Sequence, residues 1–211
     1  MELLNLLFPG LEEDSIGEIP NWDGFDYPWN ILEDRGFGLL KQIATLLGSE
    51  DYIPWEQDDN VFIHHTSIIG ESVRIDGPSY IGPHAEIRHG AYLRRGSWIC
   101  EGSLVGHASE IKNSILLPGS KAPHFNYVGD SILGNETNLG AGTKLSNVRN
   151  DRGSVPITNK NGEVFDSGLR KLGAMIGDRS QLGCNVVTNP GAIISPGAMI
   201  GPNETVSGWI G

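Results

Sequence analysis

One histidine and two cationic side chains are the residues whose types and spacing best suit chemistry on a small anionic molecule. His124 carries an imidazole, which takes up and releases protons near neutral pH and can therefore serve as a general base. Arg94 and Lys112 stand 18 residues apart, and their charged groups suit a phosphate. If the fold stacks these two cations, they repel each other unless an anion lies between them.

A period of six organises most of the chain and explains the spacing of 18. It fits neither a helix nor a simple two-residue alternation, so each hexapeptide is expected to form a short strand and a turn. Three hexapeptides close one triangular coil, and stacked coils satisfy each other's backbone hydrogen bonds in three parallel sheets. Arg94 and Lys112 then lie on the same edge in adjacent coils. The aliphatic residues of the period are Ile63, Ile69, Ile75, Ile81, Ile87, Leu93, Ile99, Val105, Ile111 and Leu117.

The period is interrupted twice. Leu117 and Leu133 are 16 residues apart, and the period then continues through Leu139 and Leu145. A longer interruption runs from about Ser146 to Gly173. We expect loops near residues 118–130 and 146–173, and we expect specificity to lie there, because stacked coils are stiff and repetitive. After the second interruption the period resumes at Ile176, Leu182, Thr188, Ile194, Ile200 and Val206.

Residues 1–60 have a different character from residues 61–211. They hold 14 acidic and two basic residues, whereas the rest holds 12 acidic and 13 basic residues. We predict an acidic, partly helical N-terminal segment over 1–60, with an extended stretch over 10–26. An amphipathic helix is expected over 28–47, packing on the first coil, with a break near 35–38 because Gly36 and Gly38 weaken it. The acidic residues form either a solvated face or an interaction surface.

Composition bounds the class of protein. The chain has 211 residues, 38% of them hydrophobic and 19% charged, which fits one or two modest domains. Only two cysteines, Cys100 and Cys184, and a beginning without a signal-peptide pattern predict a cytoplasmic location. No apolar run is long enough to span a membrane, and neither region has the basic excess of a nucleic-acid binder. We therefore expect neither membrane nor nucleic acid as a partner.

The residues around His124 carry a resemblance. They read Gly119-Ser120-Lys121-Ala122-Pro123-His124, then Gly129-Asp130, then Asn138-Leu139-Gly140-Ala141-Gly142-Thr143. With the six-residue period, this pattern resembles the hexapeptide-repeat acyltransferases. Among them it is most similar to the C-terminal acetyltransferase domain of bifunctional UDP-N-acetylglucosamine pyrophosphorylase/glucosamine-1-phosphate N-acetyltransferase. The resemblance covers about residues 28–211 and is strongest over 88–145. It implies an all-β solenoid, a left-handed parallel β-helix with a short helical N-terminal segment.

The resemblance also implies a reaction. This is acetyl-coenzyme A-dependent N-acetylation of an amino-sugar phosphate, most similar to glucosamine-1-phosphate, in UDP-N-acetylglucosamine biosynthesis by a cytoplasmic homotrimer with sites shared between neighbours. Removing a proton from an attacking amine suits an imidazole, which agrees with His124 as the catalytic base.

Each implied site residue matches one position of the family pattern. Arg94 and Lys112 would bind the sugar phosphate, and Tyr127, Asn138 and Asn147 would contact the acceptor. Lys171 would reach a neighbouring site, with Arg152 and Arg170 as alternatives. Val148 departs from the family, which usually has an aromatic residue there. Acetyl-coenzyme A, as the co-substrate, would lie along Ala141, Cys184 and Pro202.

Three other interpretations remain. The chain could be a catalytically idle binding protein for a sugar phosphate or nucleotide sugar, or an accessory subunit of a separate nucleotidylyltransferase. It could be a solenoid scaffold without chemistry. A zinc hydratase resembling γ-carbonic anhydrase would use His84 and His89, but its third ligand falls on Gly48 and leaves only His107. We expect no metal site.

Overall fold

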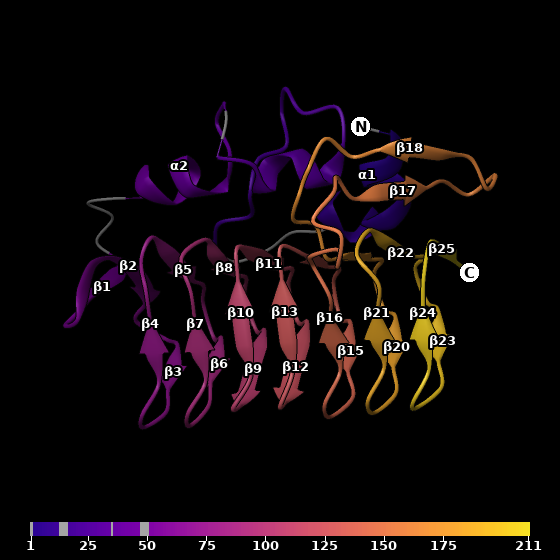
Figure 1. Ribbon diagram of the computed structural model, residues 1–211. Coiled ribbons are helices and arrows are strands. Elements are labelled where there is room, and N and C mark those ends of the chain that lie inside the picture. Colours follow the sequence, from indigo (N-terminus) through magenta and orange to yellow (C-terminus); the bar gives the residue numbers. More distant parts are fainter. Residues whose placement is uncertain (1, 13–16, 35, 47–50) are drawn as a thin grey trace.

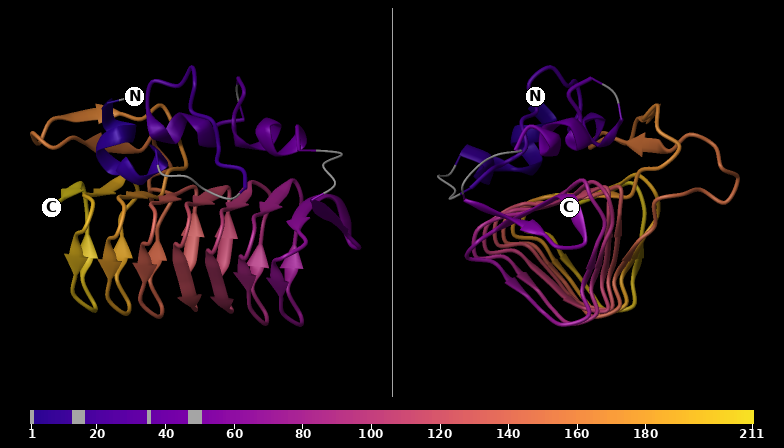
Figure 2. Two further views of the ribbon diagram at one scale, coloured as in Figure 1. Left: turned by 180° about the vertical axis from the view of Figure 1, so that it is seen from behind. Right: turned by 90° about the vertical axis from the view of Figure 1, so that its left-hand side faces the viewer.

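The computed structural model describes residues 2–12, 17–34, 36–46 and 51–211. From Asp58 onward most of the chain winds into a triangular prism with one parallel sheet on each side, and the chain visits sheets 1, 2 and 3 in turn (Figures 1 and 2). The prism is a left-handed parallel β-helix, as the resemblance to the hexapeptide-repeat acyltransferases implied. The edge where the chain passes from sheet 2 to sheet 3 is called here the 2–3 corner, and the edge from sheet 3 to sheet 1 the 3–1 corner.

The strands are short, and every pairing within the prism is parallel except that of β1 with β2. Sheet 1 consists of β1 (Tyr52–Trp55), β2 (Asp58–His64), β5 (Ser79–Ile81), β8 (Ser97–Ile99), β11 (Ser114–Leu116), β14 (Ile132–Leu133), β19 (Ala174–Ile176), β22 (Ala192–Ile194) and β25 (Trp209–Ile210). Sheet 2 consists of β3 (Ile68–Ile69), β6 (Glu86–Ile87), β9 (Leu104–His107), β12 (Lys121–His124), β15 (Asn138–Leu139), β20 (Gln181–Leu182) and β23 (Met199–Ile200). Sheet 3 consists of β4 (Arg74–Ile75), β7 (Tyr92–Leu93), β10 (Glu110–Lys112), β13 (Tyr127–Gly129), β16 (Lys144–Leu145), β21 (Val187–Thr188) and β24 (Thr205–Val206).

The aliphatic residues of the period fill the axis of the prism. Ile87, Leu93 and Ile99 are fully buried there, and residues one coil apart lie in register. Burying a row of such side chains supplies most of the favourable free energy of a coil, since a short two-residue strand has little stability of its own. Thr188 is the one polar residue of this axial row, and its buried hydroxyl has no hydrogen-bond partner.

No loop leaves the prism between residues 118 and 130, so that expectation is wrong. Leu116, five residues after Ile111, points into the axis and pairs with Ile99, and Leu133 follows Val128 by five residues in the same way. Two coils are therefore one residue shorter than the others, and in both of them the shortened turn lies at the 3–1 corner. Leu117 points outward and packs under the N-terminal segment. The sequence misled because Leu116 and Leu117 are both aliphatic.

The second interruption, residues 146–173, leaves the prism at the same 3–1 corner and is called here the insert. Its strands β17 (Pro156–Thr158) and β18 (Val164–Asp166) form an antiparallel hairpin that lies beside the N-terminal elements above sheet 1 (Figure 1). Val155, Ile157 and Leu172 bury their side chains in the core beneath it. These three residues therefore anchor the insert to the prism, while the tip of the hairpin at residues 160–164 is exposed.

The N-terminal segment covers sheet 1 along its length (Figure 2), and the part of the predicted helix at residues 39–44 packs on β5, near the first coil. The predicted helix over 28–47 is two short helices separated at 33–38, and its last residue lies outside the described part. Sheet 1 needs this cover because its outer face carries Phe62, Tyr80 and Trp98. The elements are α1 (Glu2–Leu7), η1 (Pro9–Glu12), η2 (Pro28–Leu32) and α2 (Leu39–Ala44). None of the described helices is long and apolar enough to cross a membrane.

Candidate active site

A row of residues along the 2–3 corner joins the candidate base to the predicted coenzyme residues. His124 ends β12, and its carbonyl accepts a hydrogen bond from the amide of Gly142, which follows Ala141. The carbonyls of Ala141 and Cys184 accept the corresponding bonds from Asn185 and Asn203 in the next coils. This corner row therefore contains, one coil after another, His89, His107, His124, Ala141, Cys184 and Pro202.

The backbone of His124 is held firmly while its imidazole reaches solvent. The amide of His124 donates to Asn126 Oδ1 at 2.9 Å, and Asn126 Nδ2 donates to the Gly140 carbonyl at 2.8 Å. The side chain is exposed, and it has no hydrogen-bond partner within the described part of the chain. Phe125 follows it with φ +52° and 59% exposure, its ring 5.4 Å from that of His107. An imidazole at such a protruding corner is accessible to a substrate amine.

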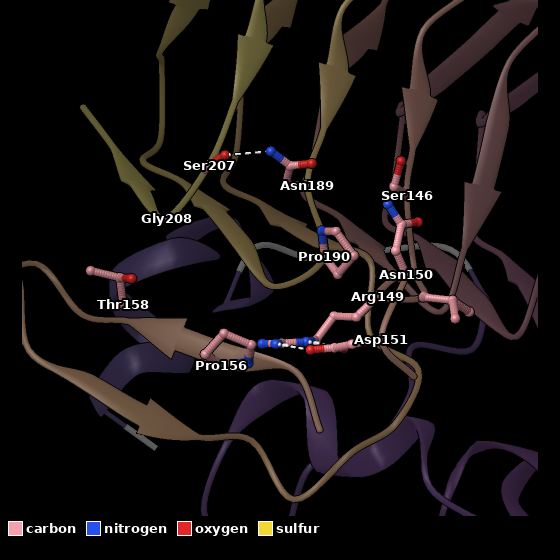
Figure 3. Close-up of a pocket in the computed structure, with 11 residues that line it drawn as sticks. Ser146, Arg149, Asn150, Asp151, Pro156, Thr158, Asn189, Pro190, Ser207 and Gly208 are labelled. Carbon is pink, nitrogen blue, oxygen red and sulfur yellow. Dashed lines mark hydrogen bonds and ion pairs between the residues drawn. The ribbon is translucent and has the colours of Figure 1, made fainter. Parts of the chain in front are cut away.

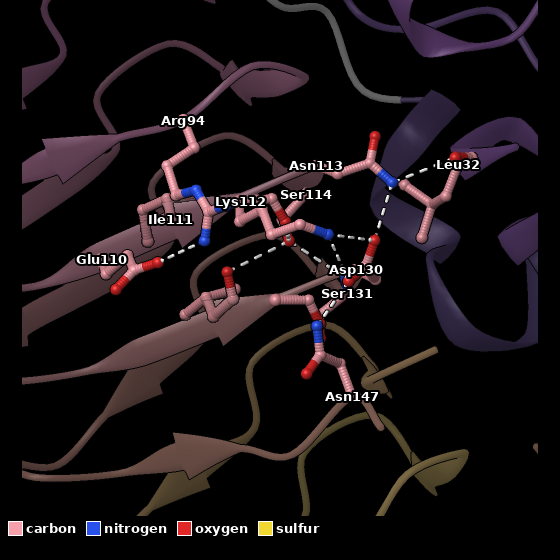
Figure 4. A network of polar contacts seen from close by, with 12 residues as sticks. Leu32, Arg94, Glu110, Ile111, Lys112, Asn113, Ser114, Asp130, Ser131 and Asn147 are labelled. Carbon is pink, nitrogen blue, oxygen red and sulfur yellow. Dashed lines mark hydrogen bonds and ion pairs between the residues drawn. The ribbon is translucent and has the colours of Figure 1, made fainter. Parts of the chain in front are cut away.

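Arg94 and Lys112 occupy adjacent coils of sheet 3, because Leu93 pairs with Ile111. Each has a carboxylate partner within the chain (Figure 4). The Arg94 guanidinium lies 2.9 Å from Glu110 Oε1, and Lys112 Nζ lies 2.8 Å from Asp130 Oδ2. The protein itself thus supplies the anions that two stacked cations require. The hydrogen bond to Glu110 also raises the pKa of Arg94.

Asp130 organises this end of the site. Asp130 is 4% exposed, and its carboxylate accepts from Lys112 Nζ, from Asn113 Nδ2 at 3.0 Å and from Asn147 Nδ2 at 2.5 Å. Asn113 Nδ2 also lies 3.0 Å from the Leu32 carbonyl of the N-terminal segment. One buried carboxylate therefore links sheet 3, the insert and the N-terminal segment. The sequence offered Asp130 only as part of a Gly-Asp pair and gave no sign of this network.

Tyr127 lies on the outer face of sheet 3 beside the same network. Burial raises the pKa of its phenol, and the negative charges of Asp130 and Glu110 raise it further, while a side-chain hydrogen bond with Asn147 opposes them. Four predicted acceptor residues thus share one region of the protein, with Asn147 buried beneath the others: Arg94, Lys112, Tyr127 and Asn147.

Asn138 and Lys171 lie elsewhere in the chain. Asn138 is on the outer face of sheet 2, where it pairs with Lys121 and Gln181, so it faces away from Tyr127. Lys171 lines a pocket of about 330 Å³ in the insert together with Val148, Arg152 and Arg170. The three basic residues among which the sequence left a choice are therefore neighbours.

The histidines considered for zinc do not converge. His84 adopts a left-handed turn at the corner between sheets 1 and 2, whereas His89 and His107 stack at the 2–3 corner with ring centroids 5.4 Å apart. Gly48 lies outside the described residues. Within the described part of the chain, no group of three or more His, Cys, Asp or Glu side chains is placed to hold a metal ion.

The left-handed prism of hexapeptide coils, with an exposed histidine in a corner row, defines the hexapeptide-repeat class of protein. No protein-family model matches the chain. A bifunctional sugar-1-phosphate nucleotidylyltransferase/acetyltransferase of Sulfurisphaera tokodaii is 37% identical over 90% of this chain and 47% of its own length. The bifunctional protein GlmU of Methanococcus vannielii is 34% identical over 81% of this chain and 40% of its own length.

Another relative matches over most of both lengths. An uncharacterized acetyltransferase of Escherichia coli is 35% identical over 71% of this chain and 71% of its own length. Among solved structures, a hexapeptide transferase family protein from Anaplasma phagocytophilum aligns with a TM-score of 0.37 at 20% identity, over 70% of this chain and 73% of that one. The chain belongs to the hexapeptide-repeat acetyltransferases and corresponds to the acetyltransferase domain of the GlmU-type bifunctional proteins. It spans less than half of the length of those bifunctional relatives.

Proposed function

We propose that this protein transfers an acetyl group from acetyl-coenzyme A to the amine of an amino-sugar phosphate, with glucosamine-1-phosphate as the acceptor. The observation that carries the proposal is the corner row, in which an exposed His124 stands one coil before Ala141 and two coils before Cys184. Family membership supports it, and so does the cluster of Arg94, Lys112 and Tyr127 on the adjoining sheet with Asn147 of the insert.

The residues of the corner row suit the co-substrate. Ala141, Cys184 and Pro202 have short, uncharged side chains, and the last two are exposed, so a long thin ligand meets no bulky group there. Bound acetyl-coenzyme A supplies the acetyl group as a thioester. The amine nitrogen of the acceptor forms the new bond to the carbonyl carbon as the carbon–sulfur bond breaks. His124 takes the proton from that nitrogen.

The acceptor residues lie on two faces of one chain, which favours a homotrimer. Asn138 on sheet 2 cannot meet Tyr127 on sheet 3 around the 2–3 corner, so we assign Asn138 and Lys171 to the site of a neighbouring copy. Hydrogen-bonding residues contributed in this way complete a site only in a closed ring of subunits. A monomer by light scattering at the concentrations used for activity would contradict this part of the proposal.

The test is release of free thiol from acetyl-coenzyme A with glucosamine-1-phosphate, with galactosamine-1-phosphate and without acceptor. We expect acceptor-dependent release by the wild type and a loss of about 100-fold or more in His124→Ala, the usual contribution of a general base. His107→Ala is the matched control, since His107 is an exposed histidine one coil away in the same row. Release that His124→Ala retains would refute the role of His124. Acceptor binding without any release would favour the idle binding protein or accessory subunit.

A further inference from the structure

The insert and the prism enclose a hollow that the proposed reaction does not use. It measures about 690 Å³ and lies at the 3–1 corner, whereas His124 lies at the 2–3 corner. We call it the insert pocket (Figure 3). Its size is that of pockets that hold small ligands. It is lined by Ser146, Val148, Arg149, Asn150, Asp151, Pro156, Thr158, Asn189, Pro190, Ser207 and Gly208.

The lining of the insert pocket combines polar and apolar groups and is electrically balanced. Arg149 and Asp151 form two hydrogen bonds of 2.8 and 2.5 Å, and Asn189 Nδ2 donates to Ser207 Oγ at 2.6 Å. These pairs fix the side chains while leaving the carbonyl oxygen of Asn189 and further guanidinium N–H groups to bind a ligand. Pro156 and Pro190 add apolar surface between the polar groups (Figure 3). Fixed donors and acceptors beside flat apolar surface suit a ring that carries hydroxyl groups, a pyranose or a ribose.

A cationic pocket adjoins the insert pocket. Val148, which is 42% exposed, lines both. The other lining residues of the cationic pocket are Arg152, Arg170 and Lys171, and Arg170 Nε donates to the Arg152 carbonyl at 3.3 Å. Within the described part of the chain, no ion pair joins any of the three to a carboxylate. Three unpaired cations around one hollow repel each other, and a phosphate with its several acceptor oxygens relieves that repulsion.

The insert pocket is separate from the group around Lys112. Along the 3–1 corner, Ser146 comes two coils after Lys112, which is roughly 10 Å at the usual spacing between strands. The beginning and end of the insert lie between them, because Asn147 bonds to Asp130 and the Gly173 amide donates to the Asp130 carbonyl. Arg94 and Lys112 are also neutralised by Glu110 and Asp130, whereas Arg152, Arg170 and Lys171 have no carboxylate partner within the described part of the chain.

We propose that the insert binds a second ligand, a sugar or nucleoside that carries a phosphate. The phosphate lies beside Arg152 and Arg170, and the hydroxylated ring lies in the insert pocket against Asn189 and Arg149; Lys171 remains assigned to the site of the neighbouring copy. The site is distinct from the corner row and needs neither His124 nor the acetyl donor.

Isothermal titration calorimetry on the wild-type protein tests the proposal. The probes are N-acetylglucosamine 1-phosphate and uridine diphosphate, with N-acetylglucosamine, inorganic phosphate and coenzyme A as comparisons. We expect at least one of the phosphorylated probes to bind about tenfold or more tightly than either free sugar or inorganic phosphate, since ring and phosphate contacts act together. The two phosphorylated probes distinguish a glycosyl phosphate from a nucleotide.

Variants then locate the site. The double variant Arg152→Ser, Arg170→Ser and the single variant Asn189→Leu should each weaken binding about tenfold or more, the scale of lost hydrogen bonds to a charged ligand. Lys160→Ala is the matched control, an exposed cation of the same insert outside both pockets, and it should change binding less than about twofold. Thermal unfolding monitored by circular dichroism shows that the variants remain folded.

Four results would overturn the proposal. The first two are that neither phosphorylated probe binds, or that inorganic phosphate binds as tightly as they do. The third is that Arg94→Ser abolishes binding while the insert variants leave it intact. The fourth is that coenzyme A competes with the probes and depends on the same insert residues. None of these results depends on acetyl transfer, so failure here is distinguishable from failure of the proposed function.

Discussion

Replacing Asp130 by Asn removes one buried charge and little else. Asp130 has φ +47°, and Asn tolerates that left-handed conformation, so the backbone is not strained. The substitution leaves Lys112, whose side chain is 18% exposed, without its counter-charge. It also turns an amide N–H toward groups that are themselves donors, because Lys112, Asn113 and Asn147 all donate to this carboxylate.

The expected cost follows from these contacts. Removing one partner of a buried ion pair typically costs about 3 to 5 kcal/mol, and Lys112 can recover part of that loss by reaching water. We therefore expect Asp130→Asn to lower the free energy of unfolding by about 3 kcal/mol. The double variant Asp130→Asn, Lys112→Met should recover about half of it, because the uncompensated ammonium is gone. Urea unfolding at one fixed protein concentration measures both values, since assembly affects stability.

Two results would refute this reasoning. A single variant within about 0.5 kcal/mol of the wild type would show that the carboxylate is not required for stability, since that is the scale of a neutral surface substitution. The single variant Lys112→Met completes the comparison. If the double variant loses as much free energy of unfolding as Asp130→Asn and Lys112→Met together, Lys112 and Asp130 do not interact.

Three further predictions concern the prism. Thr188→Val should raise the free energy of unfolding by about 1 kcal/mol in urea titration, because the buried Thr188 hydroxyl has no partner; a loss of stability would contradict this. Gly106→Ala should abolish folding, because its Cβ would lie within 1.6 Å of the Pro123 carbonyl oxygen, whereas Gly102→Ala, with open space and φ +61°, should cost only about 1 to 2 kcal/mol. Circular dichroism of the two variants shows whether each one folds, and equal loss of structure in both would contradict the prediction. Burial lowers the pKa of His64, whose Nδ1 accepts a hydrogen bond from the Thr66 amide at 3.2 Å. The folded protein therefore holds neutral His64 more strongly than the unfolded chain does, so the contribution of His64 to stability is complete above about pH 6.5 and is lost as the pH falls. His64→Gln should therefore lose less stability than the wild type between about pH 7.5 and pH 5, and parallel curves would exclude this origin.

The sequence predicted the prism because axial packing demands one aliphatic residue per hexapeptide. It also held a signal that went unused: Phe62, Tyr80 and Trp98 recur every 18 residues, on one side of the triangle only, and they mark the covered face. The two shortened coils could not be found from hydrophobicity, since Leu116 and Leu117 are equally apolar and both are buried. Only the backbone pairing of Leu116 with Ile99 shows which of the two leucines lies on the axis.

The candidate site was predictable in part. A spacing of one coil correctly indicated that Arg94 and Lys112 are neighbours, and the match around His124 directed attention to the corner row. The carboxylates that neutralise the two cations were missed, because Glu110 reaches Arg94 from the next coil and Asp130 acts from a shortened turn. The insert has no period, so its hairpin and pockets follow from packing that the sequence does not display.

Between Ile63 and Val206, every departure from a six-residue spacing of the axial residues lies at one edge of the triangle. From sheet 1 through sheet 2 to sheet 3 the axial residues stay six apart, whereas the step across the 3–1 corner is five residues from Ile111 to Leu116 and 31 from Leu145 to Ile176. An insertion or deletion at that edge leaves the phase of every other hexapeptide intact. Evolution and protein engineers can therefore exchange segments at the 3–1 corner, changing what the molecule recognises, while the opposite edge with His124 keeps its geometry.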